Sequence, residues 1–329
     1  MKSLKATAGF GADAALTSGF GFLVILLAAR LGSVADFGQF ALVLAIVAAQ
    51  SPLAAFGLST LAYGRAAARP AGVRRLLGSA MVIVAVAGAG LYALTLFAFA
   101  AFAGEALTML YAAAGLRLIG AVGVVLPQDA MARQALGEYL PARHLTVTLA
   151  AVAAVTAFSI DAPLYTLALI WGAESLGFAV LCALTLGRNR ARLSTRNRYR
   201  PYLAKAGPIA VQSLFVIVYL RFDQIYVGWR FGEESLGLYA AAARIAELGN
   251  LGFNVLTLVV SPMIIRQMRV SGRLDRRALL LFTAMAGITL AASAAAMMMG
   301  GPALGMLFGP AYAAAGLILA VYLASVFFV

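Results

Sequence analysis

Long apolar runs, each able to cross a lipid bilayer, recur from one end of the chain to the other. A transmembrane helix needs about 20 mostly apolar residues. The chain is 63% hydrophobic and only 11% charged, whereas an average soluble domain is about 45–50% apolar and about 25% charged. A soluble protein of this size could not bury that excess, so the sequence predicts an all-α polytopic membrane protein with about ten transmembrane helices. The runs lie near residues 8–29, 37–62, 77–103, 106–127, 144–160, 163–187, 206–228, 236–265, 278–299 and 310–329.

The basic residues of the connecting segments gather on one side of the predicted membrane. They occupy the N-terminus and every second loop, and the densest group is the sequence RNRARLSTRNRYR at 188–200. The alternate loops hold only Arg30 and Arg230, beside acidic residues. Because basic loops resist translocation, we expect the N-terminus and the basic side, which includes Arg133 and Arg143, to be cytoplasmic. The net charge of +13 then fits contact with anionic membrane lipids and gives no reason to expect nucleic acid.

Two recurring patterns indicate an internal repeat. The sequence YAAAGL occurs at 111–116 and again at 312–317. An Arg-x-Gly pattern begins at Arg30 and again at Arg230, each time in the outer loop that joins the first two helices of a half. The offset equals six predicted helices, so the two copies cross the membrane in the same direction. Paired halves of this kind are common in transporters, where the substrate path runs between them.

The repeat divides the chain into two predicted lobes. Gly38 of the first copy aligns with Gly237 of the second. We expect a six-helix N-terminal lobe over 1–187, a basic cytoplasmic linker over 188–205 and a C-terminal lobe over 206–329. By symmetry the second lobe should also have six helices, but only four fit within the sequence. Either the chain is a fragment that lacks two helices or the second copy is naturally incomplete, and we favour the fragment.

Two stretches carry a resemblance to a known family. AARLGSVADFGQFALV at 28–43, followed by AAFGLSTLAYGRAA at 54–67, resembles the opening helix pair of the polysaccharide-type flippases, which include O-antigen translocases. RFDQIYVGWRFGEESLGLYAAAARIAELGN at 221–250 resembles their seventh and eighth helices. These flippases belong to the multidrug/oligosaccharidyl-lipid/polysaccharide exporter (MOP) superfamily. The resemblance covers most of the chain, but its glycines and scattered apolar positions specify the family better than any subfamily.

The resemblance implies a function as well as a fold. It implies two six-helix lobes around a central cavity lined mainly by helices one, two, seven and eight. It also implies a lipid-diphosphate-linked saccharide as substrate, moved across the bacterial cytoplasmic membrane by alternating access. Such a protein is not an enzyme, needs no cofactor or metal, and draws on coupling to protons or sodium ions. Its expected partners are a polysaccharide polymerase and glycosyltransferases.

Charged residues inside the seventh and eighth predicted helices form the main candidate site. A charge near the bilayer centre costs a few kcal/mol, so each needs a partner or a water-filled cavity. If the two helices fold back around residue 232, Asp223 and Arg244 lie at similar depth, and Arg221 and Glu247 match almost as well. One interpretation is an Asp223–Arg244 ion pair that locks the hairpin. The other is a cavity in which the arginines bind phosphate oxygens and the acids act as a protonation switch.

Two further charged residues, in the fourth and sixth predicted helices, suggest a second ion pair. Arg117 and Glu174 each lie about eleven residues beyond the outer start of their helix, or roughly 16 Å deep. Equal depth within one half favours an ion pair with a structural role. Asp13, about two turns inside the first helix, has no partner that the sequence identifies, and its carboxylate could reach towards the inner surface.

Three amides complete the set of candidate residues. Gln212 shares a helix face with Asp223, eleven residues away. Gln50 and Asn250 occupy matching positions of the two copies, 200 residues apart. Such amides could bind sugar hydroxyl groups, or they could hold helices together through hydrogen bonds.

Two other functions compete with the flippase interpretation. A multidrug-type cation antiporter of the same superfamily would favour unpaired acids in the cavity. A membrane glycosyltransferase or ligase would need catalytic acids, but the sequence contains no Asp-x-Asp pair and every predicted outer loop is short. The single cysteine, Cys182, lies in an apolar run and is interpreted as a small buried hydrophobic residue.

Overall fold

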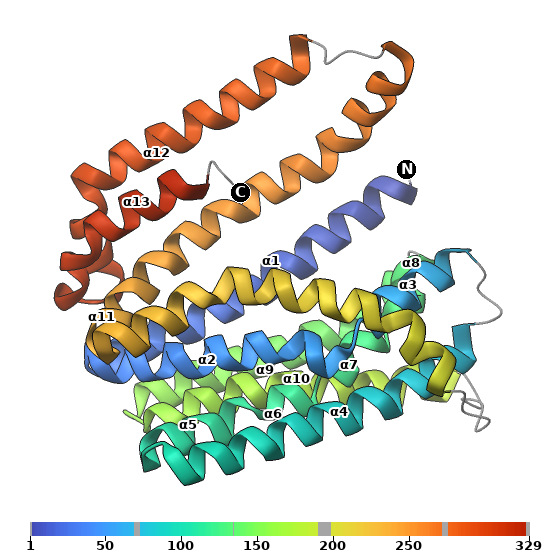
Figure 1. Ribbon diagram of the computed structural model, residues 1–329, viewed down its shortest axis with the longest axis horizontal. Helices are drawn as coiled ribbons and strands as arrows, with labels where there is room; N and C mark the ends of the chain where they lie inside the picture. Colours follow the sequence, from blue (N-terminus) through green and yellow to red (C-terminus); the bar gives the residue numbers. More distant parts are fainter. Residues whose placement is uncertain (1, 69–72, 134, 190–198, 272–275, 327–329) are drawn as a thin grey trace. The chain divides into compact units, whose positions relative to one another are not determined.

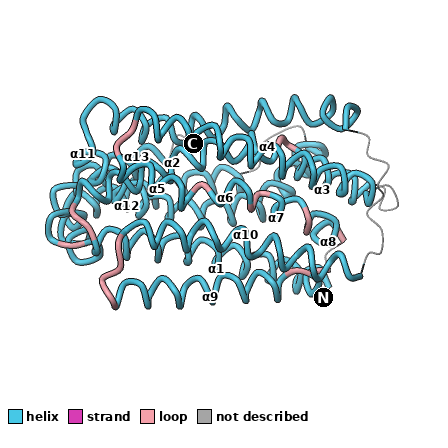
Figure 2. Tube along the Cα trace, turned by 90° about the horizontal axis from the view of Figure 1, so that it is seen from below, coloured by secondary structure: helices cyan, strands magenta, loops and turns pink. Residues whose placement is uncertain are grey.

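The computed structural model is helical throughout the residues that it describes, which are 2–68, 73–133, 135–189, 199–271 and 276–326. Those residues form no strand, and short turns join the helices (Figures 1 and 2). Among these described residues, eight helices are long and apolar enough to cross a membrane. The predicted class, an all-α polytopic membrane protein, is therefore confirmed. The eight spans are Gly11–Leu31, Val34–Ala55, Leu76–Phe102, Glu105–Val125, Leu140–Ser159, Leu164–Thr185, Tyr199–Leu248 and Leu290–Phe308.

One helix contains two of the predicted runs, 206–228 and 236–265. Helix α11 (Tyr199–Ser271) is interrupted at Gly232, where the backbone has φ 86° and ψ 176°. This is the residue around which the sequence predicts a hairpin, and glycine adopts a positive φ without the steric cost of a Cβ atom. A shorter apolar segment, Pro310–Ser325, corresponds to the last predicted run.

The fourth predicted run is broken into short helices. These are α5 (Glu105–Ala114), α6 (Leu116–Ile119) and α7 (Val122–Val125). Glycines stand at the breaks, and the backbone of Gly120 packs against Ser175, whose carbonyl carbon would lie 2.6 Å from an added Cβ. Small residues of this kind let membrane helices approach closely, which is how such helices associate without a hydrophobic driving force.

The described helices fall into two compact units. Unit 1 comprises Met1–Gly32 and Gln39–Tyr226, and unit 2 comprises Ser33–Gly38 and Val227–Val329. By this division the first part of α11, up to Tyr226, falls in unit 1. The lobe boundaries at 187 and 206 stay a prediction. The remaining elements are named by position, as α1 (Lys2–Leu31), α2 (Val34–Ala55), α3 (Leu58–Ala68), α4 (Val73–Phe102), α8 (Gln128–Ala132), η2 (Leu136–Glu138), α9 (Leu140–Ser159), α10 (Leu164–Asn189), α12 (Arg276–Phe308), η3 (Pro310–Ala315) and α13 (Gly316–Val326).

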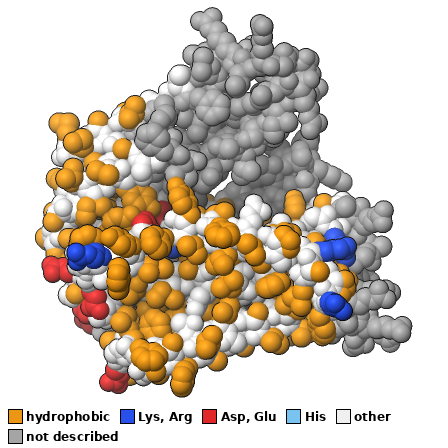
Figure 3. All heavy atoms as spheres, viewed as in Figure 1, with side chains coloured by type: hydrophobic (Ala, Val, Ile, Leu, Met, Phe, Trp, Pro, Cys, Tyr) orange, Lys and Arg blue, Asp and Glu red, His pale blue; other side chains and the backbone are white. Residues whose placement is uncertain are grey.

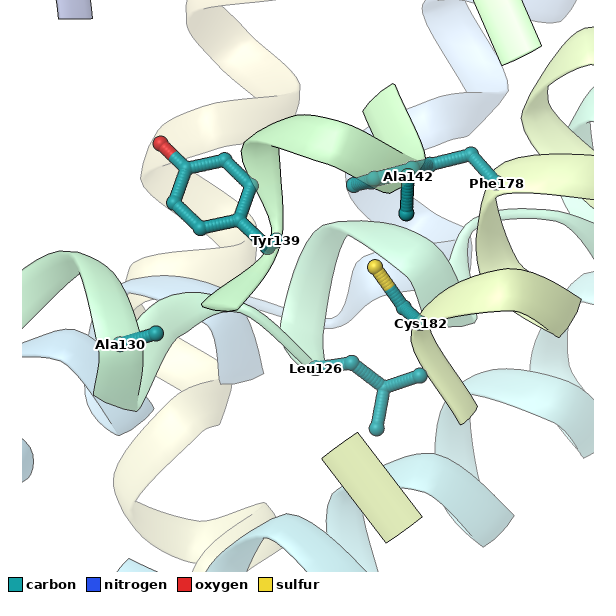
Figure 4. Close-up of a cluster of buried hydrophobic side chains, with 6 residues drawn as sticks. All are labelled: Leu126, Ala130, Tyr139, Ala142, Phe178 and Cys182. Carbon is teal, nitrogen blue, oxygen red and sulfur yellow. The ribbon is translucent and has the colours of Figure 1, made fainter. Parts of the chain in front are cut away.

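Helix α10 is the central element of unit 1. It contacts α1, α5, α6, α7 and α9. In its C-terminal half, Phe178 and Cys182 pack with Leu126, Ala142 and Tyr139 in a buried cluster (Figure 4). The Cys182 side chain is fully buried there, as expected of a small hydrophobic residue.

The outer surface of unit 1 is apolar where a bilayer would meet it. On α4 the side chains of Phe97 and Phe102 are 72% and 91% exposed. In the coloured part of Figure 3 hydrophobic side chains are widespread, and most of the charged side chains lie towards its two ends. An apolar band between charged ends is the surface expected of a protein whose surrounding solvent is lipid.

Unit 2 contains a close helix crossing and an aromatic cluster. The aromatic ring of Phe37 lies 6.4 Å from that of Phe308 and 5.7 Å from that of Tyr312, measured between centroids. Gly38, the residue after Phe37, faces the carbonyl oxygen of Glu233, and Gly237 faces that of Val34. The two aligned glycines of the repeat therefore make reciprocal contacts.

Candidate functional site

Four charged side chains meet inside unit 1, contributed by four different helices. Glu174 of α10, whose side chain is 1% exposed, lies between two arginines. Its Oε1 atom accepts a hydrogen bond from Arg143 of α9 at 3.2 Å, and its Oε2 atom lies 3.5 Å from Nη1 of Arg117 on α6. Asp13 of α1 completes the group, with Oδ1 3.9 Å from Nε of Arg143. The structure thus brings together Arg117 and Glu174, which the sequence analysis predicts to form an ion pair because they lie at the same depth.

Aromatic rings cover both arginines of this group. The Arg117 guanidinium lies 4.3 Å from the centroid of the Trp171 ring, and its Nη1 also donates to the carbonyl oxygen of Trp171 at 3.4 Å. The Arg143 guanidinium lies 3.5 Å from the ring centroid of Phe178. Stacking on an aromatic face suits the planar guanidinium and lowers the cost of keeping it away from water.

The charges of this group balance within the protein. Two guanidiniums face two carboxylates, and Glu174 has hydrogen-bond partners for both of its oxygens. Such a group ties α1, α6, α9 and α10 together and supports a structural role for Arg117 and Glu174. Asp13 is the most weakly held member of the group, because the 3.9 Å between its Oδ1 and Nε of Arg143 is too long for a hydrogen bond.

The hydroxyl group of Tyr139 lies just outside the α9 span, near Asp13 and Arg143. Burial raises the pKa of Tyr139 to about 12. The phenol therefore stays neutral and able to donate a proton to a hydrogen bond throughout the physiological pH range. In Figure 4 this hydroxyl points away from Cys182.

Gln50 is engaged at both ends of its amide. Its Oε1 accepts a hydrogen bond from the hydroxyl of Tyr111 at 2.9 Å, and its Nε2 donates to the hydroxyl of Thr95 at 2.6 Å. Tyr111 in turn stacks on Phe99, with ring centroids 4.8 Å apart. These bonds favour the interpretation of Gln50 as a residue that holds helices together. The side chain of its repeat partner, Asn250, lies outside the described residues.

The charged residues of α11 are divided between the two units. In unit 2, Nη1 of Arg244 lies 2.8 Å from Oε2 of Glu247, one turn away on the same face. In unit 1, Asp223 accepts a hydrogen bond from the backbone N–H of Gln224 at 2.7 Å. The side chain of Arg221 is partly buried, and that of Gln212 is exposed. The Asp223–Arg244 pair stays a prediction.

A second charge cluster, which the sequence does not identify, lies in the segment before α9 in unit 1. Arg133 makes hydrogen bonds to both carboxylate oxygens of Asp129, each at 3.3 Å. It also bonds both oxygens of Glu138, at 3.1 and 3.0 Å. These bidentate contacts hold the segment that joins α8 to α9 through η2. The signal in the sequence is the spacing of the three residues, four and five apart around the arginine.

We expect Arg133→Gln to loosen this segment with only a small effect on overall stability. The side chain of Arg133 is 37% exposed, so solvent screening limits the loss to about 1 kcal/mol or less. The measurement is thermal unfolding of the purified protein, with hydrogen exchange of residues 129–139 as a local probe. Arg133→Lys keeps the positive charge but loses the paired hydrogen bonds of the guanidinium, so its exchange rate in this segment should lie between those of the wild type and Arg133→Gln. Faster hydrogen exchange throughout unit 1 would contradict a local role for Arg133.

Comparisons with known proteins identify the family and the fold of this chain. A model of the family described as polysaccharide biosynthesis protein matches residues 27–316. No curated protein matches the chain. The chain is similar to the inward-facing structure of a multidrug resistance MATE family transporter of the MOP superfamily, with 17% identity and a TM-score of 0.68 over 94% of this chain and 76% of that one.

Other solved structures share the same fold. A MATE transporter in complex with MaD3S is 16% identical, with a TM-score of 0.62 over 99% of this chain and 81% of the other. A MOP superfamily transporter from Pyrococcus furiosus is 14% identical, with a TM-score of 0.61 over 99% of this chain and 81% of the other. At these identities the likeness concerns the fold. On the match over 27–316, the chain belongs to the polysaccharide biosynthesis protein family, and it has the fold of the MOP superfamily transporters.

Proposed function

We propose that this protein is a flippase that moves a lipid-diphosphate-linked oligosaccharide or polysaccharide precursor across the bacterial cytoplasmic membrane by alternating access. The observation that carries the proposal is the polysaccharide biosynthesis family match over 27–316, on a chain with a transporter fold. Translocation of this kind makes and breaks no covalent bond. It fits a chain whose long helices are joined by short segments.

Arg244 is our first candidate ligand for the diphosphate. Its side chain is 16% exposed and is paired with Glu247, so its charge is compensated while no substrate is bound. A diphosphate offers a guanidinium two planar sets of oxygens and can compete with one carboxylate. Arg221 is the second candidate. Displacement of Glu247 from Arg244 would let its carboxylate take up a proton or sodium ion, with Asp223 as a second carboxylate for this role, and this is the coupling that we propose for transport.

The test is the amount of glycan that reaches the outer surface of cells in which this chain is the only flippase. Arg244→Ala should lower it at least about tenfold, because a hydrogen bond to a charged group contributes about 1.5–3 kcal/mol. Arg230→Ala, an exposed arginine of the same helix, is the matched control and should leave the glycan unchanged. The amount of each variant in the membrane is measured in parallel.

Glu247→Gln separates substrate binding from a structural role. If Arg244 serves only to pair with Glu247, both variants should lose surface glycan to the same extent. If Arg244 binds the diphosphate, Glu247→Gln should retain more transport than Arg244→Ala, because Asp223 still supplies a carboxylate for coupling while Arg244 stays available to the diphosphate. Unchanged surface glycan in Arg244→Ala would remove this arginine as a ligand.

A second candidate function follows from the transporters of similar fold. One of them is described as a multidrug resistance transporter, so export of an organic cation is the alternative. A substrate cation would be bound by carboxylates and repelled by Arg244 and Arg221. Resistance to cationic dyes that depends on this chain, with no change in surface glycan, would favour the multidrug function. The family match favours the saccharide as substrate. With that substrate, we propose a polymerase and glycosyltransferases as functional partners. Anionic lipids would contact the basic side, which we propose to be cytoplasmic.

A further inference from the structure

The first half of α11 carries an exposed face of unusual composition. Phe215, Tyr219, Phe222 and Tyr226 are 70%, 70%, 58% and 44% exposed. The rings of Phe222 and Tyr226 are stacked, with centroids 6.2 Å apart. Residues seven apart lie nearly in line along a helix, since two turns contain about 7.2 residues. We call this surface the aromatic face; it consists of Lys205, Pro208, Gln212, Phe215, Tyr219, Phe222 and Tyr226, all in unit 1.

The aromatic face has two parallel rows that differ in chemistry. One row runs through Lys205, Gln212 and Tyr219, and it offers an amine, an amide and a phenol. The other row runs through Pro208, Phe215 and Phe222, and it offers only apolar surface. Each member of the second row follows a member of the first by three residues, so the rows are neighbours on the helix.

A surface that meets only acyl chains would not have this composition. Tyr219 lies thirteen residues before Gly232, or about 20 Å along the helix, which is near the middle of a hydrocarbon core about 30 Å thick. A phenol or amide that faces hydrocarbon without a hydrogen bond costs roughly 2–7 kcal/mol. The exposed tyrosine at this depth therefore points to a polar ligand or to water.

Helix α4 of the same unit provides the comparison. Its most exposed large side chains are all purely apolar, including Val86, Leu94 and Phe97 at 67–72% exposure. Two polar groups near the middle of the helix turn inward, because the Tyr92 hydroxyl donates to the carbonyl oxygen of Ala112 at 2.9 Å and Thr95 accepts a hydrogen bond from Gln50. Helix α4 thus has a lipid-facing pattern, and the aromatic face of α11 departs from it.

We propose that the aromatic face binds the saccharide part of the substrate as it crosses the membrane; this rests on the proposed function and extends it. A sugar ring has apolar C–H faces and a rim of hydroxyl groups. Its C–H face fits against Phe215 and Phe222, while its hydroxyls bond to Tyr219 and Gln212 in the adjacent row. Lys205 adds charge complementarity at the cytoplasmic end, where the negatively charged diphosphate enters.

The repeated spacing suits a moving ligand. Equivalent side chains recur every seven residues, so a sugar displaced by about 10 Å meets the same pair of chemistries again. Aromatic surface binds through large contact area at low entropic cost, and it holds no charge that would trap a neutral sugar. The face therefore supports passage more readily than a single tight site would.

The single cysteine permits a direct test. Cys182 is fully buried, so Cys182→Ala gives a cysteine-free background. In that background we place single cysteines by Phe215→Cys and Tyr219→Cys, with Phe97→Cys on α4 as the matched control at 72% exposure. The reagent is a membrane-impermeant maleimide applied to inverted membrane vesicles. Because only a thiolate reacts and a thiolate needs water, we expect labelling at 215 and 219 at least about tenfold faster than at 97.

A second arm identifies the ligand. The lipid-linked saccharide pool extracted from the membranes of the source cells is added before the maleimide, and the same pool stripped enzymatically to polyprenyl diphosphate serves as the comparison. We expect the intact pool to slow labelling at both positions and the stripped pool to have little effect. Labelling as slow as at 97 would show that the face meets lipid, and equal protection by both pools would show recognition of the lipid diphosphate. Either result overturns the saccharide proposal, while the surface-glycan test of Arg244 judges the flippase function separately.

Discussion

Glu174→Gln is expected to destabilise the protein by about 3 kcal/mol, since removal of one partner from a buried ion pair typically costs 3–5 kcal/mol. The carboxylate of Glu174 is 1% exposed and is shared by Arg117 and Arg143. Without its charge, two guanidiniums remain in unit 1 with only Asp13, 3.9 Å from Arg143, to compensate them. Thermal unfolding in a fixed detergent measures the change. Glu234→Gln, which removes an exposed carboxylate, is the control and should have no resolvable effect.

A double variant tests the electrostatic explanation. Arg117→Gln combined with Glu174→Gln removes one positive and one negative charge together. If unbalanced charge causes the loss, the double variant should be more stable than the sum of its single variants implies, by about 1–3 kcal/mol of coupling. Additive losses would instead indicate that packing, and the stacking of Arg117 on Trp171, dominates. If Glu174→Gln and Glu234→Gln had the same melting temperature, the charge group would have no role in stability.

The sequence predicts part of this charge group, and the limit has a physical cause. Counting residues from the outer ends of two helices puts Arg117 and Glu174 at the same depth, because helical rise is regular. Arg143 is missed, since its run is taken to start at 144 and the residue is assigned to the cytoplasmic side. Helix α9 begins at Leu140. The proline at its start, Pro141, is the signal that could have moved the boundary.

The backbone breaks are likewise predicted in α11 but not in the fourth run. The turn at Gly232 is predicted from the positions of the apolar runs, and the structure places a positive φ at that residue. The breaks in the fourth run are not predicted, because glycine is common in membrane helices and its effect depends on what packs against it. Which helices touch is also hidden from the pattern, since a side chain that faces lipid and one that faces a neighbouring helix are equally apolar.

The crossing of the two aligned glycines is a further case in which alignment alone does not give the contact. Gly38 and Gly237 correspond in the repeat, and the structure places each against the backbone of the other copy, at Glu233 and Val34. Reciprocal contacts between equivalent residues are what a pseudo-two-fold relation produces. A Cβ atom at either glycine would collide with a carbonyl oxygen, which is backbone and cannot rotate away.

Gly38→Ala should therefore destabilise the protein by about 1–3 kcal/mol, the usual cost of overpacking. Gly38→Leu should prevent recovery of folded protein, because its larger side chain would have to separate the two helices. The matched control is Gly90→Ala on α4, where an added Cβ meets no atom within 4 Å. That substitution removes a glycine from a helix and should be neutral or stabilising by up to about 1 kcal/mol.

The comparison of the two alanine variants decides the question. Both replace a helical glycine by the same residue, so intrinsic helix propensity cancels and only the contact at Gly38 differs. Melting temperature and the monodisperse fraction after size-exclusion chromatography are the measurements. Gly237→Ala should reproduce the loss seen for Gly38→Ala, because the contacts are reciprocal, and the double variant should lose less than the sum once the two helices have moved apart. Equal melting temperatures for Gly38→Ala and Gly90→Ala would mean that the helices do not approach each other this closely in the protein.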